Sequence, residues 1–167
     1  LRPIYTVTGR NLPPEAEITK LGGYGQSRPV RISNAAANQV QLDVFGPVVD
    51  LVAMLDERGS PLTPDHWRLV RAMVQAVEAR WREPDHGIWE RRAERRHHVH
   101  SKVMGWMTID RAIRLRVSLL GSPDPAWIRL RDEIRRDVLA NGWHEGAQAY
   151  TTSYGCPQLD AASLWIG

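Results

Sequence analysis

The chain has 167 residues, of which 43% are hydrophobic, and its 22 Lys and Arg against 19 Asp and Glu give a formal net charge of +3. A single domain commonly has about 100 to 200 residues, so this length and composition predict one globular domain and exclude a disordered tail or a fibrous repeat. The lone cysteine, Cys156, excludes an internal disulfide and favours a reducing compartment, so we expect a cytoplasmic protein. No hydrophobic run approaches the roughly 18 residues that a membrane span needs, and we expect no membrane association.

The ends of the chain indicate a part of a longer protein. The N-terminus has no initiator methionine and no signal-peptide pattern, and residues 164–167 are largely apolar. The small positive charge comes mostly from arginines interleaved with acidic residues, a pattern typical of solvated helix faces. Nucleic-acid binding through the arginine-rich residues 91–96 is an alternative, but we expect no nucleic acid among the partners.

Apolar residues at spacings of three and four predict a series of helices. The first, from about residue 34 to 55, is apolar over much of its circumference, and Pro47 is expected to kink or break it. Two amphipathic helices begin after Thr63 and Asp124, because each of these is a good N-cap followed by proline. Between them, a helix from about Ser101 is again apolar on several faces, and a further apolar helix starts at 159–163.

Buried and amphipathic helices thus alternate, with short links after the buried helices and long links after the amphipathic ones. Two concentric layers of helices produce this alternation, because an inner helix is covered on most sides and an outer helix buries one stripe. The three long segments, residues 21–33, 83–100 and 141–158, are then expected at one face, at the N-terminal ends of inner helices. Functional sites are commonly built from such loops.

The middle long segment contains a candidate catalytic carboxyl group. Glu90 follows Trp89 in a turn that also contains Gly87. A neighbouring indole can reduce the solvation of a carboxyl group and raise its pKa, as a general acid requires. The alternative is an exposed glutamate that pairs with Arg91 or Arg92.

Four motifs resemble those of glycoside hydrolase family 15, which includes bacterial glucoamylases, glucodextranases and trehalases. In chain order they are GYGQSRPVRISNAA at residues 23–36, DHGIWE at 85–90, HSKVMGW with DRA at 100–112, and SYG with LDA at 153–161. Their order and spacing agree with the family over essentially the whole chain. The resemblance implies an all-α fold, an arc of an (α/α)6 barrel, with residues 1–167 as a partial catalytic domain that lacks its N-terminal and C-terminal parts.

The resemblance also implies an inverting α-glucoside hydrolase, with trehalose as the leading substrate and the α-glucans of a glucoamylase as the runner-up. Glu90 matches the family's general acid, which protonates the glycosidic oxygen while a second carboxylate, about 6.5 to 9.5 Å away, activates water. Trp89 is then expected to stack on a sugar ring. Further sugar contacts are expected from Tyr24, Arg28, Arg31 and Lys102.

The chain departs from the family pattern in ways that bear on activity. Arg91 stands where fungal relatives have a second acidic residue. The family's Trp-x-Arg-Asp motif and its general base fall outside these residues, and the spacing of Asp85, Asp160 and Glu145 recommends none of them as a replacement base. We therefore expect the isolated chain to have little or no hydrolase activity.

Other interpretations remain open. His97, His98 and His100 suggest a metal, but no Cys or carboxylate spacing completes a zinc site, so no metal is expected there. The chemistry requires no cofactor, although resemblance to the family's trehalases makes phosphate and magnesium candidates, with Arg95 and Arg96 as an anion site. A noncatalytic helical module that binds carbohydrate or assembles with other chains is the second class of function. An arc would also leave inner-helix surface exposed, through which the chain could self-associate.

Overall fold

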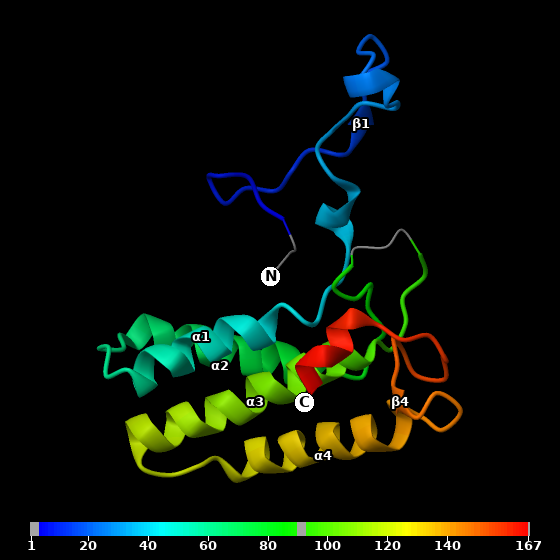
Figure 1. The fold of residues 1–167 in the computed structure, drawn as a ribbon. Helices are drawn as coiled ribbons and strands as arrows, with labels where there is room; N and C mark the ends of the chain where they lie inside the picture. Colours follow the sequence, from blue (N-terminus) through cyan, green and yellow to red (C-terminus); the bar gives the residue numbers. More distant parts are fainter. Residues whose placement is uncertain (1–3, 90–92, 167) are drawn as a thin grey trace. The chain divides into compact units, whose positions relative to one another are not determined.

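The computed structural model describes residues 4–89 and 93–166. The chain divides into two compact units, one within residues 1–40 and the other within residues 41–167 (Figure 1). Four α-helices dominate the described residues, and the β-structure there amounts to two sheets of two short strands each. The predicted all-α fold class is therefore confirmed. None of the described helices is long and apolar enough to span a membrane.

The first unit is built around a short antiparallel hairpin. Strand β1, Ala16–Glu17, pairs with β2, Arg31–Ile32. A 3-10 turn, η1 at Tyr24–Gln26, lies in the connection between these strands. A second 3-10 helix, η2 at Ala35–Asn38, follows β2 and is capped by the side chain of Asn34.

The first α-helix is shorter than the sequence predicts. Residues 34–44 contain only the 3-10 helix η2, and α1 spans Phe45–Glu57, so the expected helix start near residue 34 is wrong. Pro47 consequently lies in the first turn of α1 and does not break a longer helix. A proline is tolerated there because the first N–H groups of a helix have no intrahelical acceptor.

The two amphipathic helices begin where their capping residues predict. Thr63 precedes α2, Pro64–Arg80, and its hydroxyl group accepts a hydrogen bond from the His66 amide. Asp124 precedes α4, Pro125–Asn141, and caps it in the same way.

The remaining elements also agree closely with the predicted order. Helix α3, Val99–Leu120, begins slightly before the predicted start at Ser101. The hairpin of β3, Trp143–His144, and β4, Ala149–Tyr150, follows α4. The predicted last helix is a 3-10 helix, η3 at Ala161–Ile166.

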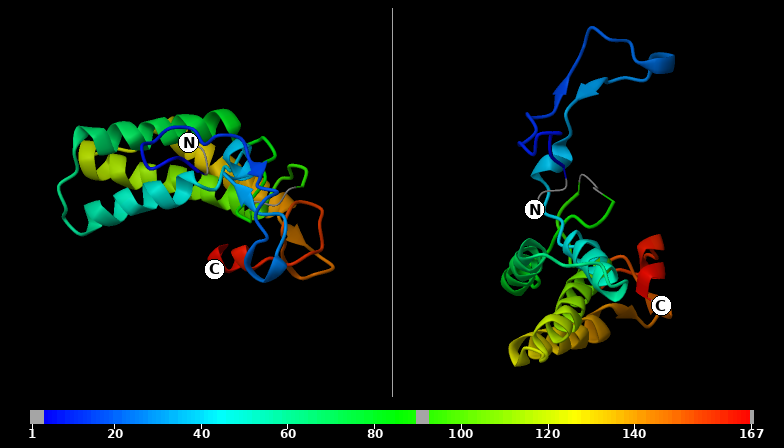
Figure 2. Two further views of the ribbon diagram at one scale, coloured as in Figure 1. Left: turned by 90° about the horizontal axis from the view of Figure 1, so that it is seen from above. Right: turned by 90° about the vertical axis from the view of Figure 1, so that its left-hand side faces the viewer.

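Helix α3 is the centre of the second unit and contacts α1, α2 and α4 (Figure 2). It is buried on several faces, with Ile109 and Leu115 at most 1% exposed, whereas α2 and α4 bury one stripe each. Gly46 allows α1 to approach α3 closely, since a Cβ there would lie 2.9 Å from the Met104 carbonyl oxygen. The contrast between α3 and its amphipathic neighbours fits inner and outer helices, and closure into a barrel stays a prediction.

Candidate active site

The long segments that precede α3 and follow α4 meet at the start of α3. His98 and Ser153 form an antiparallel bridge, and the Val99 amide donates a hydrogen bond to the Thr152 carbonyl group at 3.3 Å. Two of the three long segments therefore lie together, as the alternation of helices predicts. The third, residues 21–33, belongs to the first unit.

Trp89 lies in a turn whose base is fixed by backbone pairing. Asp85 and Arg96 exchange two backbone hydrogen bonds, of 2.9 and 2.8 Å, and so close the loop that connects them. Gly87 has a φ of 68°, and a Cβ at this position would lie 2.9 Å from the His98 ring. Glycine is required here, because any other residue would adopt an unfavourable backbone conformation and also meet the histidine.

The Trp89 indole is oriented by a carboxylate from the far end of the second unit. Its N–H donates to Asp160 Oδ1 at 2.7 Å, and the same oxygen accepts a hydrogen bond from the Ala162 amide at 2.9 Å. Trp89 nevertheless remains 52% exposed, so its ring is accessible to a ligand. The adjoining cavity has a volume of only about 10 Å³, whereas small-molecule sites have about 300 to 1,000 Å³. The described residues around Trp89 thus form no closed pocket, and the stacking of Trp89 on a sugar stays a prediction.

Glu90 and Lys102 are the other two predicted site residues in this unit. Glu90, the predicted general acid, lies outside the described residues, so its role stays a prediction. Lys102 is 3% exposed, and its ammonium group donates hydrogen bonds to the carbonyl groups of Trp81 and Glu83. Burial lowers the pKa of Lys102, while the charge of Asp85 opposes this shift. Its contact with a sugar stays a prediction, and the observed bonds give it a structural role.

The remaining predicted sugar-binding residues, Tyr24, Arg28 and Arg31, lie exposed in the first unit. Tyr24 is 97% exposed. Arg28 donates a hydrogen bond to a backbone carbonyl group of the same unit at 3.4 Å. Arg31 forms ion pairs with Glu15 and Glu17 at 3.3 and 3.1 Å. Their contacts with a sugar also stay predictions.

The three carboxylates considered as replacement bases occupy different environments. Asp85 is 1% exposed, and its Oδ2 accepts a hydrogen bond from the Leu42 amide at 2.9 Å. Asp160 is half-buried against Trp89, and Glu145 is exposed on the β3–β4 hairpin. Asp85 is therefore a structural carboxylate, closed off from the water molecule that a general base would activate.

Asp43 is a buried carboxyl group that the sequence analysis did not single out. It lies just before α1, is 6% exposed, and its Oδ1 has no hydrogen-bond partner among the described residues. Burial, and then the negative charge of Asp85, raises the pKa of Asp43 to about 6. No signal in the sequence marks it, because an aspartate before a helix is ordinarily an exposed capping residue.

The histidines near the start of α3 do not assemble a metal site with the rest of the described chain. Within residues 4–89 and 93–166, no group of three or more His, Cys, Asp or Glu side chains could hold a metal ion. His97 stacks on Tyr154 with ring centroids 5.8 Å apart, and the Tyr154 hydroxyl donates to Asp137 at 2.7 Å. Burial lowers the pKa of both His97 and His100 and so favours their neutral forms.

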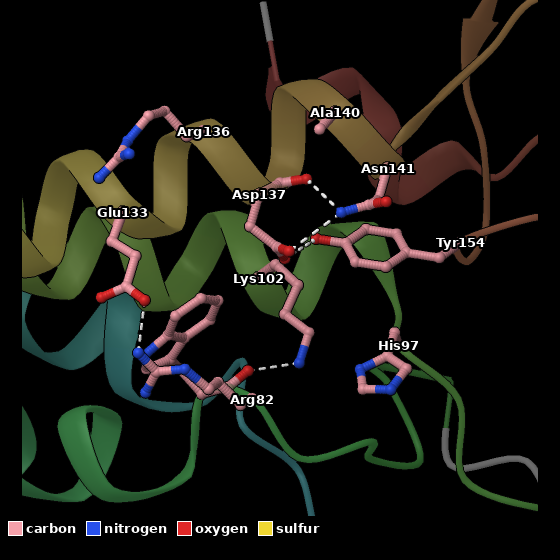
Figure 3. A pocket seen from close by; sticks show the side chains of 10 residues that line it. Arg82, His97, Lys102, Glu133, Arg136, Asp137, Ala140, Asn141 and Tyr154 are labelled. Atoms are coloured by element: carbon pink, nitrogen blue, oxygen red, sulfur yellow. Dashed lines mark hydrogen bonds and ion pairs between the residues drawn. The ribbon is translucent and has the colours of Figure 1, made fainter.

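A larger cavity, of about 560 Å³, lies beside α3 near the ends of α2 and α4 (Figure 3). Lys102 and Tyr154 line it together with charged side chains of both signs, among them the ion pair of Arg82 and Glu133. Trp89 does not line this cavity. The mixed charge favours neither an anion nor a cation, and the cavity is separate from the turn that carries the indole.

Residues 1–166 match the family model described as glycosyl hydrolases family 15. The chain belongs to this family. It is 35% identical over 165 residues to a trehalase of Thermoplasma volcanium, 36% over 168 residues to a trehalase of Mycobacterium tuberculosis, and 37% over 166 residues to a trehalase of Mycolicibacterium smegmatis. No solved structure matches it.

The family 15 chain corresponds to a segment of these relatives. The three alignments cover 98%, 99% and 98% of this chain but 26%, 24% and 25% of the relatives, so the chain spans about a quarter of their length. The family resemblance inferred from the four motifs is thereby confirmed.

Proposed function

We propose that this chain forms part of the catalytic domain of an inverting α-glucoside hydrolase whose substrate is trehalose. The proposal is carried by the similarity of 98 to 99% of the chain, at 35 to 37% identity, to proteins named trehalase. The exposed Trp89 ring beside Glu90 in the sequence supports a sugar site at this turn.

In the proposed mechanism, Glu90 protonates the glycosidic oxygen as the bond to the anomeric carbon breaks. A carboxylate from outside these residues removes a proton from the attacking water on the opposite face of the sugar. The Trp89 ring packs against the sugar and, by excluding water, keeps the acid protonated. Hydrogen bonds to sugar hydroxyl groups are assigned to Tyr24, Arg28 and Arg31, whereas the ammonium group of Lys102 is already bonded to backbone carbonyl groups.

The substrate is tested with the complete enzyme that contains this segment. Its kcat/KM for trehalose should exceed that for maltose, and the reverse order would support a glucoamylase-type enzyme. The isolated chain of 167 residues should cleave neither sugar, because it carries the acid of the catalytic pair and not the base. Calorimetric binding of trehalose by the complete enzyme without turnover would support a noncatalytic carbohydrate-binding module instead.

The proposed chemistry needs no cofactor, and phosphate is a candidate activator. Arg95 and Arg96 are exposed and precede α3 closely in sequence, which suits an anion site. The described residues offer no cluster suited to magnesium. Phosphate should raise the melting temperature of the complete enzyme, and the double change Arg95→Ala with Arg96→Ala should abolish the rise.

The isolated chain is proposed to self-associate through the inner helix α1. Leu51 and Met54 of this helix are 57% and 43% exposed, which is unusual for large apolar residues of an inner helix. Sedimentation should show a concentration-dependent mass that Leu51→Lys reduces toward that of a monomer, whereas a wild-type chain that is already monomeric would contradict this. The proposed partners are a carbohydrate substrate and further copies of this chain or other segments of the complete enzyme. Neither nucleic acid nor a membrane is proposed as a partner. The proposed location is the cytoplasm.

A further inference from the structure

Two buried, charged side chains hold the segment that leads into the Trp89 turn. The first is Lys102 of α3. Its ammonium group bonds to the carbonyl group of Trp81, the C-cap of α2, and to that of Glu83 at 2.8 Å. An ammonium group has three N–H donors, so at least two of them tie the end of α2 and the start of the following loop to the central helix.

The second side chain is Asp85, which joins the base of the turn to the residues just before α1. Its backbone pairs with Arg96 at the point where the loop closes, and its Oδ2 accepts a hydrogen bond from the Leu42 amide at 2.9 Å. Leu42 is 5% exposed and lies shortly before α1 begins at Phe45. The two ends of the short segment 81–85 are therefore fixed, one to α3 and the other to the residues that lead into α1.

The carboxylate of Asp85 also acts on the ammonium group of Lys102. The negative charge of Asp85 favours the charged form of Lys102, which burial disfavours.

We propose that Asp85 and Lys102 are positioning residues that fix the turn carrying Trp89 relative to α1 and α3, and that they act on catalysis without touching the sugar. The inference rests on the proposed function, in which this turn forms the acid side of the sugar site. It gives Lys102 a role different from the direct sugar contact expected from the family resemblance, and it removes Asp85 from the candidate bases.

The test compares kcat with KM in the complete enzyme. Displacement of a catalytic turn by about 1 Å can cost about 100-fold in rate, so Asp85→Ala and Lys102→Met should each lower kcat by about this factor while KM changes by less than about threefold. Asp85→Asn should recover most of the lost kcat, because its side-chain oxygen can still accept the Leu42 N–H. Asp132→Ala, which changes an aspartate that is 50% exposed on α4, is the matched control and should retain wild-type kcat.

A second readout follows the turn directly. In the complete enzyme labelled with 15N-tryptophan, the indole N–H resonance of Trp89, assigned with Trp89→Phe, should shift or broaden in Asp85→Ala and Lys102→Met. It should remain near its wild-type position in Asp85→Asn and Asp132→Ala. If either single variant fails to fold, the double variant Asp85→Asn with Lys102→Met, which removes both buried charges, takes its place and should show the same lowered kcat.

The outcomes separate this inference from the proposed function. Wild-type kcat and an unmoved Trp89 resonance in Asp85→Ala would overturn the inference, even if Glu90→Gln abolished activity. A raised KM with unchanged kcat in Lys102→Met would show that Lys102 binds the sugar directly and would also overturn its positioning role. An enzyme without glucosidase activity would overturn the proposed function, while the Trp89 resonance would still decide whether Asp85 and Lys102 hold the turn.

Discussion

Replacement of Glu90 by Gln should lower kcat for trehalose in the complete enzyme by about 10³-fold, within the range usual for loss of a general acid. Glutamine has nearly the size and hydrogen-bonding reach of glutamic acid, but its amide N–H groups are not acidic enough to protonate the glycosidic oxygen. Because binding of the intact sugar does not need this proton, KM should change far less than kcat. Steady-state rates of glucose release over a range of trehalose concentrations measure both constants.

Glu94→Gln is the matched control for this change. Glu94 is an exposed glutamate in the same loop, and the same substitution there should leave kcat within about twofold of the wild type, because exposed positions tolerate such changes. Equal losses in the two variants would indicate a general disturbance of the loop. Full activity in Glu90→Gln would exclude Glu90 as the acid.

Asp43→Asn should raise the free energy of unfolding above that of the wild type, and this gain should be larger at neutral pH than at acid pH. The pKa of Asp43 is about 6 in the folded chain against a usual value of 3.8, so the folded state binds the proton more tightly than the unfolded state does. Stability contributed by this proton is present below about pH 4 and is lost as the pH rises through about 6. The shift of about two pKa units corresponds to at most about 3 kcal/mol at pH 7, which asparagine should recover because it has no charge to bury.

Urea unfolding at about pH 4.5 and about pH 7.5 measures this difference. His97 and His100 have lowered pKa values, so their contribution is lost as the pH falls, and it cancels when the two proteins are compared at the same pH. Asp132→Asn, at an exposed position, should show no such pH dependence relative to the wild type. A stability difference between Asp43→Asn and the wild type that does not grow with pH would contradict the raised pKa of the buried Asp43.

Capping residues predict the starts of α2 and α4 correctly, whereas apolar periodicity misplaces the start of α1. Thr63 and Asp124 precede prolines, so the chemistry of the cap is complete within a few residues. The predicted start of α1 is too early, because Val40 and Val44 fit a helical spacing with the residues that follow. Periodicity reports which residues are apolar and cannot show that the backbone before Phe45 is not helical.

In the candidate site, too, the sequence predicts local features and misses the contacts between distant residues. The sequence places Trp89 in a turn with Gly87, and the structure has this turn, with the indole 52% exposed. The sequence could not show that Asp85 is buried, since the group that binds its carboxylate is a backbone amide 43 residues away. The partners of Lys102 are likewise backbone carbonyl groups, which every residue carries and no motif can reveal.

The most direct test of Glu90 as the general acid uses a substrate whose leaving group needs no proton. Fluoride is a weakly basic leaving group, so α-glucosyl fluoride can be hydrolysed with little acid assistance, whereas trehalose must have its glycosidic oxygen protonated. In the complete enzyme, Glu90→Gln should lose about 10³-fold in kcat/KM for trehalose and far less for α-glucosyl fluoride. Equal losses on the two substrates would contradict the assignment of Glu90 as the acid.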